Sequence, residues 1–563
     1  MTSTIYVGTA SIWVVFKPST EIGTSPRFLC HAVPLFRVRG SILMHVARGA
    51  GKFCATGRFL PIPFPIQISI SVNLSLPRPK YTMALKYTTI EDLQSAHAEL
   101  RKSFQAKKAI PLAFRRAQLL QLARLFQENN DSLIAAHNSD LGRHKLEITL
   151  PEMGPIVSGA VRAAESLEEW NKPEKPAVEE WRSSWDTTVY TTPKGVVLII
   201  GPWNYPFVCT ILPLIGAIAA GCPCVVKPSE FSPASAQLLA ELFPKYLDTS
   251  VYRIVNGAVE ETTALLELKW EHIFFTGSGR VGRIIAAAAV KHVTPLTLEL
   301  GSKSPVFIDA DNTDIELAAK RILWGKQQNA GQCCVSPDYV LVPRAHQDAV
   351  AEAFKKAYRK FWPHPKGALD PSSELSSILN QHHYGRIMEL LRRTQGNIAH
   401  GGNADGLKRI EPTLVTDVGL DDSLMEDELF CPIIPVVPVD DVLDAIQIIQ
   451  ARPVPLVIYV FTDSEETKNK CTSLLGIPPN SGTLVLNDTF TQLGIHEMPF
   501  GGQGDSGYGS YLGKFSFNTF VHRRSYINVP PSFEPFLGHR YPPFTEEGFQ
   551  ALSAPANIKI PDL

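Results

Sequence analysis

The chain has 563 residues, of which 44% are hydrophobic and 19% charged, and its formal net charge is -1. This length is enough for more than one domain with a buried core, and the balanced charge argues against a nucleic-acid-binding protein. The nine cysteines are irregularly spaced and contain no Cys-x-x-Cys pair, so neither a disulfide framework nor a zinc site is favoured. We therefore expect a soluble protein with reduced thiols, no metal site and no nucleic-acid partner.

Residues 1–82 differ from the rest, with nine Lys and Arg residues against a single acidic residue, Glu21. Their apolar runs are far shorter than the roughly 20 residues that a membrane-spanning helix needs. A basic, acid-poor segment is typical of mitochondrial targeting, but Pro61, Pro63 and Pro65 would break an amphipathic helix. We predict a disordered extension or a gene-model artefact, and a cytoplasmic protein; a targeting role would make it mitochondrial.

The first elements predicted after Met83 are helices. Residues 88–91 (Thr-Thr-Ile-Glu) have the form of a capping box, and apolar residues follow at helical spacing through Leu100. A second helix is predicted from Pro111. Residues 170–195 are rich in Trp, Pro and charge, so we predict an excursion from the core with an extended piece at 188–190.

From Gly195 onward the pattern alternates between short apolar strands and helices. Strands are predicted at 196–200, 225–226, 252–255, 272–275 and 297–300, with helices at 206–220 and from near 233, 260 and 279. Continuous apolar strands of this kind form a parallel sheet that helices cover on both faces. Ligands bind beyond the carboxyl ends of such strands. The chemically interesting residues at those ends are Asn204, Lys227, Glu230, Ser278 and Glu299.

A second α/β domain is predicted after residue 303. Its strands are expected at 306–308, 339–342, 457–461 and 483–486, with a long helix near 346–361. A glycine-rich loop follows at 499–504, and a Pro-rich tail begins at Val529.

Two adjacent cysteines, Cys333 and Cys334, follow the small-residue pair Ala330-Gly331. A turn of small residues can bring backbone N–H groups close to a reacting atom, so a thiol there is a candidate nucleophile. An inert buried cysteine or a vicinal disulfide would also explain the pair.

A glycine pattern at Gly277, Gly279 and Gly282 matches the dinucleotide fingerprint, since it follows a predicted strand and opens a helix. A turn that needs positive φ would look the same. The acidic residue expected at the end of the next strand is absent at the usual spacing, because that strand ends in Glu299.

Seven segments occur in the order found in the aldehyde dehydrogenase superfamily, which the chain resembles from Met83 onward. They are residues 201–206 (Gly-Pro-Trp-Asn-Tyr-Pro), 226–230 (Val-Lys-Pro-Ser-Glu), 275–278 (Phe-Thr-Gly-Ser), 298–305 (Leu-Glu-Leu-Gly-Ser-Lys-Ser-Pro), 331–334 (Gly-Gln-Cys-Cys), 428–432 (Glu-Leu-Phe-Cys-Pro) and 499–502 (Pro-Phe-Gly-Gly). Tyr205 and residues 516–520 (Ser-Phe-Asn-Thr-Phe) are similar to the class-three branch.

The resemblance implies an α/β fold with a doubly wound Rossmann-type cofactor domain, a second α/β catalytic domain and a small bridging and oligomerisation β element. The expected cofactor domain is 83–170 with 195–298, and the catalytic domain is 299–503. The bridging element would be 171–194 with 504–530, followed by a tail at 531–563. The implied activity is NAD(P)-dependent oxidation of a medium- or long-chain aliphatic, aromatic or apocarotenoid aldehyde to its carboxylate, by a homodimer without a transmembrane anchor.

The resemblance also implies roles for the site residues. Cys334 matches the nucleophile, Asn204 the oxyanion donor and Glu299 the residue that activates water. Burial between Leu298 and Leu300 would raise the pKa of Glu299 toward neutrality. The alternatives are a helix cap for Asn204 and a solvated strand end for Glu299.

The cofactor residues follow from the same resemblance. Lys227 and Glu230 match residues that hold the adenosine ribose, although a surface ion pair is the alternative. Thr276, Gly277, Ser278 and Gly282 match a Gly-Ser-x-x-x-Gly pattern that meets the pyrophosphate, which makes Gly279 incidental. Glu428 and Phe430 match residues at the nicotinamide ribose and ring. Glu230 would repel a 2′-phosphate, so NAD is expected, with NADP also accepted.

Two departures from the family pattern bear on activity. Ser302 and Cys431 stand where relatives usually have glycine, and a need for positive φ at either position would cost stability. These departures leave open a catalytically impaired dinucleotide-binding relative. A cysteine-dependent esterase also stays open, because the same thiol and carboxylate could act on esters.

Overall fold

The computed structural model describes residues 2–7, 10–15, 84–476 and 481–562, which belong to two compact units, Met1–Arg78 and Pro79–Leu563. In the first unit β1 (Thr2–Val7) pairs antiparallel with β2 (Ala10–Val15). The disorder predicted for 1–82 falls mainly on residues outside the described ones. No helix in the described ranges is long and apolar enough to cross a membrane.

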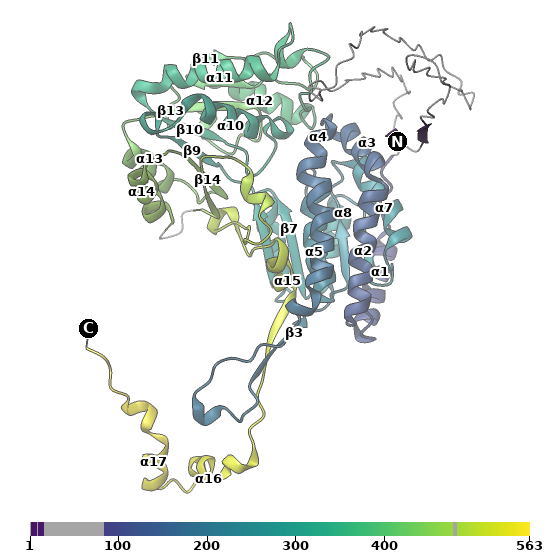
Figure 1. The fold of residues 1–563 in the computed structure, drawn as a ribbon, viewed down its shortest axis with the longest axis vertical. Coiled ribbons are helices and arrows are strands. Elements are labelled where there is room, and N and C mark those ends of the chain that lie inside the picture. Colours follow the sequence, from purple (N-terminus) through teal and green to yellow (C-terminus); the bar gives the residue numbers. More distant parts are fainter. Residues whose placement is uncertain (1, 8–9, 16–83, 477–480, 563) are drawn as a thin grey trace, which may run out of the picture. The chain divides into compact units, whose positions relative to one another are not determined.

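The first sheet of the second unit has the strand order β16-β8-β7-β4-β5-β6. Its strand β7 is labelled in Figure 1. Its parallel strands are β4 (Val197–Ile200), β5 (Cys224–Lys227), β6 (Tyr252–Ile254), β7 (His272–Gly277) and β8 (Leu296–Leu300). Each lies within two residues of its predicted position, because these apolar runs are buried on both faces. The predicted doubly wound sheet is confirmed.

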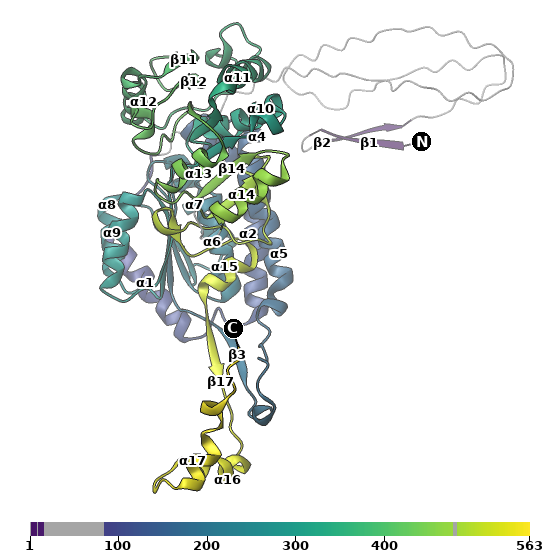
Figure 2. The same cartoon turned by 90° about the vertical axis from the view of Figure 1, so that its left-hand side faces the viewer.

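Helices cover both faces of this sheet, and β4 shows how the side chains divide. Val197 and Ile199 belong to one core, with helices α2 (Leu112–Glu128), α5 (Gly154–Trp170), α6 (Val208–Ala220) and α7 (Pro233–Tyr246). Leu198 and Ile200 belong to the other, with α1 (Ile90–Gln105), α8 (Val259–Glu267) and α9 (Gly279–Val290). Successive strand side chains point to opposite faces, and Figure 2 shows these two helix layers on either side of the sheet.

The helices before the sheet only partly follow the prediction. Helix α1 begins one residue later than the predicted capping box implies, because Thr89 rather than Thr88 is its N-cap and accepts the Asp92 N–H at 3.1 Å. Like α5, two further helices that follow α2 were not predicted, namely α3 (Asn130–Leu141) and the short α4 (Lys145–Ile148). Both later prove relevant to the site.

The second sheet has seven strands in the order β11-β12-β13-β10-β9-β14-β15. Strand β11 pairs antiparallel with β12, and all the other neighbouring strands are parallel. The strands are β9 (Pro305–Ile308), β10 (Tyr339–Pro343), β11 (Asn397–His400), β12 (Thr413–Thr416), β13 (Ile433–Val439), β14 (Val457–Phe461) and β15 (Thr483–Leu486). The accompanying helices are α10 (Ile315–Gln327), α11 (Gln347–Phe361), α12 (Gln381–Arg393), α13 (Val442–Gln450) and α14 (Glu465–Gly476).

A two-stranded antiparallel ribbon joins β3 (Thr188–Pro193) to β17 (Val521–Tyr526). Of the residues 504–530 predicted for the bridging element, only β17 belongs to this ribbon. Residues 504–520 lie with the first sheet instead, where β16 (Gly507–Tyr508) pairs with β8 and α15 (Gly513–Phe520) packs on α6. The predicted division between 298 and 299 also falls inside β8.

The tail after the ribbon forms two short helices, α16 (Glu534–Leu537) and α17 (Glu546–Leu552). Its aromatic rings meet the excursion before β3, with Phe536 against Trp181 and Phe533 against Trp185 at centroid distances of 5.7 Å. The excursion and the tail therefore pack on each other.

Candidate active site

The predicted site residues come from the carboxyl ends of the first sheet's strands and from two loops of the second domain. Asn204 follows β4, Glu299 lies in β8, and Cys334 and Glu428 come from the second domain. Burial raises the pKa of the Tyr511 hydroxyl, and the charges of Cys209, Glu299 and Cys334 raise it further.

Residues 329–334 form the nucleophile loop, named after the role predicted for Cys334. It begins with three consecutive residues of left-handed backbone, Asn329, Ala330 and Gly331, whose φ angles are 51°, 51° and 75°. Two of them carry side chains, and such conformations typically cost about 1–3 kcal/mol each. A Cβ on Gly331 would lie 2.2 Å from the Cys431 carbonyl oxygen, so only glycine fits there. The small-residue turn inferred from the sequence is thus a strained one.

Side-chain amides hold this turn in place. Asn329 Nδ2 donates to the Asn204 carbonyl at 3.0 Å and to the Gln332 carbonyl at 3.2 Å. Gln332 Nε2 donates to the Asn329 carbonyl at 2.9 Å, and Gln332 Oε1 accepts the Leu379 N–H at 3.0 Å. The strained turn is therefore tied both to the loop after β4 and to residues after 375.

Both thiols of the pair are free, so the vicinal disulfide is not formed. Cys333 is buried and Cys334 is partly exposed. Contact with the Cys333 thiol, and then burial, raise the pKa of Cys334. Burial acts to raise the pKa of Cys333, but the Cys334 thiol, the Val335 N–H and neighbouring groups outweigh it and lower that pKa. The two thiols thus shift each other's pKa in opposite directions, and the more exposed Cys334 is the one that an outside molecule can reach.

Asn204 points at the nucleophile loop. Its Nδ2 donates to the Gln332 carbonyl at 3.1 Å, which uses one of the two donors of the amide. The helix-cap alternative is wrong, because α6 begins at Val208 after Phe207, with no side-chain cap. The structure therefore brings this amide to the peptide just ahead of Cys333.

Glu299 is 3% exposed, and neither carboxylate oxygen has a hydrogen-bond partner among the described residues. Burial raises the pKa of this carboxyl well above its usual range, in the direction expected from the sequence. The solvated-strand-end alternative is wrong, because β16 pairs with β8 at Gly507 opposite Glu299. The result is a carboxyl group without a hydrogen-bond partner among the described residues, shielded from bulk solvent.

Lys227 and Glu230 form an ion pair of 3.1 Å between Nζ and Oε2 at the end of β5. The Lys227 side chain is only 4% exposed and also donates to the Pro228 carbonyl at 3.2 Å, so this is not an ordinary surface pair. A fixed charge pair at a strand end can hold the hydroxyl groups of a ligand.

The loop after β7 follows the Gly-Ser-x-x-x-Gly pattern in its packing. Ser278 is the N-cap of α9 and accepts the Val281 N–H at 3.4 Å. A Cβ on Gly277 would meet the Phe275 ring at 2.5 Å, and one on Gly282 would meet Leu300 at 2.6 Å, whereas one on Gly279 would be accommodated. Gly279 is therefore the incidental glycine, as the resemblance implied.

Glu428 and Phe430 lie on a loop that closes against the first domain. The Glu428 Oε2 atom is 2.2 Å from where a Cβ on Gly301 would be, and the Phe430 ring meets Trp203 at a centroid distance of 5.6 Å. Burial, and then Asp338, raise the pKa of Glu428. Phe430 itself has a positive φ of 48°.

A dinucleotide fits this set of residues. Three side chains at the strand ends and the second-domain loop, Thr276, Glu299 and Glu428, have buried oxygen atoms without a partner in the described part of the chain. Buried polar atoms are normally hydrogen-bonded, so a ligand with hydroxyl groups would satisfy them. The start of α9 adds free backbone N–H groups suited to phosphate.

The two departures from the family pattern, Ser302 and Cys431, do not strain the backbone. Ser302 and Cys431 are not among the described residues with positive φ, so neither side chain is strained. Ser302 Oγ accepts the Leu456 N–H at 2.7 Å, which ties the β8–β9 connection to the start of β14. The added hydroxyl is thus used.

Replacing Ser302 with alanine is expected to lower the free energy of unfolding by about 1–2 kcal/mol, because the Leu456 N–H loses its acceptor. Urea unfolding followed by circular dichroism measures this. Ser473→Ala, an exposed serine on α14, is the matched control and should change stability little. An unchanged urea midpoint for Ser302→Ala would show that the hydrogen bond between Ser302 and Leu456 does not stabilise the fold.

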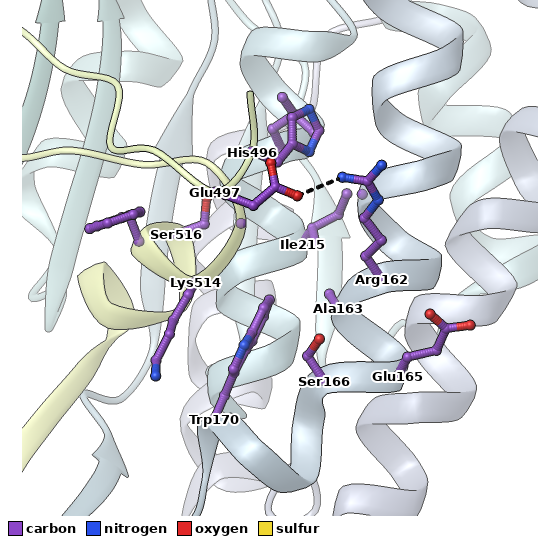
Figure 3. A pocket seen from close by; sticks show the side chains of 14 residues that line it. Arg162, Ala163, Glu165, Ser166, Trp170, Ile215, His496, Glu497, Lys514 and Ser516 are labelled. Carbon is purple, nitrogen blue, oxygen red and sulfur yellow. Dashed lines mark hydrogen bonds and ion pairs between the residues drawn. The ribbon is translucent and has the colours of Figure 1, made fainter. Parts of the chain in front are cut away.

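A separate pocket of about 360 Å³ lies between α5, α6 and α15. Figure 3 shows Arg162 and Glu497 paired at 3.1 Å, with His496, Lys514 and Trp170 around the same space. None of the predicted catalytic or cofactor residues lines this pocket.

Sequence reasoning missed a buried charge network next to Tyr205. Glu152 accepts from the Phe207 and Val208 N–H groups at 3.0 and 3.2 Å, from Arg143 at 2.9 Å, and lies 2.6 Å from His137 Nε2. Charged residues on helices usually belong to a solvated face, so nothing in the sequence indicated that these are buried.

Comparison with known proteins agrees with the geometry. The model of the aldehyde dehydrogenase family matches residues 78–526. Aldehyde dehydrogenase family 3 member H1 of Arabidopsis thaliana is 38% identical over 472 residues, which cover 83% of this chain and 95% of that protein. Aldehyde dehydrogenase family 3 member A2 of Rattus norvegicus is 41% identical over 449 residues, which cover 79% and 90%.

A third relative, the dimeric NADP-preferring aldehyde dehydrogenase of Rattus norvegicus, is 40% identical over 444 residues, covering 79% of this chain and 96% of that protein. Among solved structures, the substrate-bound state of Staphylococcus aureus AldH aligns with a TM-score of 0.78 and 35% identity, covering 83% of this chain and 99% of that one. The family match spans both sheets and every predicted site residue. The chain belongs to the aldehyde dehydrogenase family, and within it to the class-three branch.

Proposed function

We propose that this protein oxidises an aldehyde to its carboxylate through a covalent intermediate on Cys334, with NAD(P) as hydride acceptor. The observation that supports it most is the reciprocal hydrogen bonding between the loop of Asn204 and the strained turn before Cys334. An amide donor and a reachable thiol are thereby held on one rigid unit. Preorganisation of this kind is what acyl chemistry needs.

In the proposed reaction the Cys334 thiolate attacks the aldehyde carbon and forms a thiohemiacetal oxyanion. The free donor of the Asn204 amide and the Cys334 N–H stabilise that oxygen, and losing one such donor typically costs about 3–4 kcal/mol. When bound, NAD(P)+ supplies the acceptor for the hydride that leaves this carbon. Glu299 then takes a proton from water, which attacks the thioester and releases the carboxylate and the thiolate.

The cofactor residues have matching proposed roles. Lys227 and Glu230 would hold the adenosine ribose, the start of α9 with Ser278 the pyrophosphate, and Glu428 with Phe430 the nicotinamide half. A carboxylate at Glu230 opposes a 2′-phosphate, which supports NAD as the better cofactor, with NADP accepted.

Replacing Glu230 with glutamine is expected to shrink the preference for NAD over NADP by roughly tenfold, because like-charge repulsion of the 2′-phosphate is removed. Steady-state kinetics with each cofactor measure the ratio of kcat/KM values. Glu168→Gln, an exposed carboxylate on α5, should leave the ratio unchanged. A ratio that moves toward NAD would show that Glu230 does not face the 2′ position.

The proposal also includes a substrate class, an oligomeric state and a cellular compartment. We propose medium- or long-chain aliphatic, aromatic or apocarotenoid aldehydes as substrates and a homodimer as the working form, the state that the rat relative's name gives for that protein. The cytoplasm is the proposed compartment, since the free thiols of the site need a reducing environment.

An aldehyde panel of graded chain length, with NAD and with NADP, tests the function by absorbance of the reduced cofactor. Aldehyde-dependent reduction that varies with chain length would support the proposal. Cofactor binding without turnover under full reduction would mean an impaired relative. Ester hydrolysis indifferent to cofactor, without aldehyde oxidation, would mean a cysteine-dependent esterase.

A further inference from the structure

Glu147 on the short helix α4 connects two distant segments at the nucleophile loop. Its Oε1 accepts the Asn329 backbone N–H, and its Oε2 accepts the Ser376 hydroxyl at 2.8 Å. The side chain is only 8% exposed. Both carboxylate oxygens are therefore used, one of them by the first residue of the strained turn.

Arg143 keeps Glu147 in position from the other side. The fully buried guanidinium donates through Nη2 to the Glu147 carbonyl at 2.5 Å and through Nη1 to Glu152 Oε1 at 2.9 Å. It also lies over the Tyr205 ring, 4.3 Å from its centroid, next to Asn204. Glu147 is thus fixed to the same buried network that supports the start of α6.

The turn at Asn329 links the Glu147 carboxylate to the loops that carry Asn204 and Cys334. A left-handed backbone at Asn329 and Ala330 persists only where its surroundings hold it. The Asn329 side chain then bonds the Asn204 and Gln332 carbonyls, and Asn204 Nδ2 bonds the Gln332 carbonyl in return. Only Cys333 separates Gln332 from Cys334.

We propose that Glu147 is a positioning residue for the nucleophile, since its carboxylate fixes the left-handed turn and so sets Cys334 against Asn204. This inference rests on the proposed function for the roles of those two residues. It assigns no chemical step to Glu147, which touches neither reacting atom. What it adds is a determinant of reactivity in a helix that precedes Cys334 by almost 190 residues.

The test compares Glu147→Ala with Glu147→Gln. Loss of the acceptor in the alanine variant is expected to lower kcat by about 10²-fold, the scale of a small misplacement of reacting groups. KM for NAD should stay within about twofold, because Lys227 and Glu230 lie on β5, away from this contact. The glutamine variant keeps one carbonyl acceptor and should recover most of the rate. The rate of Cys334 alkylation by iodoacetamide should follow the same order without cofactor.

A double-mutant cycle separates positioning from general destabilisation. If Glu147 acts through the Asn204 geometry, Glu147→Ala should slow an Asn204→Ala enzyme little further. Glu374→Ala, a 69% exposed carboxylate two residues before Ser376, is the matched control and should leave kcat unchanged. If Glu147→Ala does not fold, Ser376→Ala is used instead and should lower kcat while the unfolding midpoint stays near that of the control.

Three outcomes would overturn the inference: an unchanged kcat in folded Glu147→Ala, effects that multiply independently with Asn204→Ala, or a glutamine variant as slow as the alanine variant. Failure of the proposed function looks different. In that case the unmodified enzyme would show no aldehyde oxidation at all, although its Cys334 alkylation could still depend on Glu147.

Discussion

Replacing Cys334 with alanine is expected to abolish aldehyde-dependent reduction of NAD(P), a loss of more than about 10³-fold. Without the thiolate the aldehyde carbon stays planar, so no tetrahedral adduct forms from which hydride can leave. Binding of the dinucleotide should persist, because none of its proposed contacts involves the sulfur. Absorbance assays of turnover and fluorescence titration of cofactor binding give the two readouts.

Cys333→Ala is the matched control for this prediction. Cys333 is 5% exposed and belongs to a core cluster with residues from both sheets, so it should not reach an aldehyde. The Cys333 variant should therefore still oxidise aldehydes, and mass spectrometry should find the acyl adduct on Cys334. Wild-type turnover by Cys334→Ala, or an adduct on Cys333, would move the nucleophile by one residue.

Glu299→Gln is expected to stop the enzyme after a single turnover. Hydride can still leave the Cys334 adduct, but no carboxylate remains to take the proton of the attacking water. General-base catalysis contributes typically about 10²–10⁴-fold, so steady-state turnover should fall by that factor after a burst of one equivalent. Stopped-flow absorbance detects the burst, and intact-protein mass detects the thioester on Cys334.

The pH dependence of turnover gives the same residue a second test. Burial raises the pKa of Glu299, and only its ionised form can act as base. The hydrolysis rate should therefore fall as the pH drops through this raised pKa, in a range above that of exposed carboxylates. Glu299→Gln should lack this acid limb. Persistence of the limb in the variant would assign it to another group, such as Glu428, whose pKa burial also raises.

The elements best predicted from sequence are those that tertiary contacts bury most evenly. Strand β14 was predicted at residues 457–461 and occurs there, since all five of its residues are buried and its apolar run has clear ends. Strands β11 and β12 were not predicted, because they are short and β11 is half exposed. Strand β13 was missed although it is buried, because Pro435 and Pro438 interrupt its apolar run. Strand β16, which has two residues, exists only because β8 offers it an edge.

The sequence by itself determined the family, and it predicts Cys334, Asn204 and Glu299 as the catalytic residues, because each lies in a local motif whose residue types serve one chemistry. Only the tertiary structure decided the burial, the hydrogen bonding and the backbone conformation of these residues. The orphaned oxygens of Glu299 arise from burial by β16, and the strained turn before Cys334 is held by Glu147 and Gln332. Such contacts join segments far apart in the chain, and no local pattern encodes the burial that gives a charged side chain its partner.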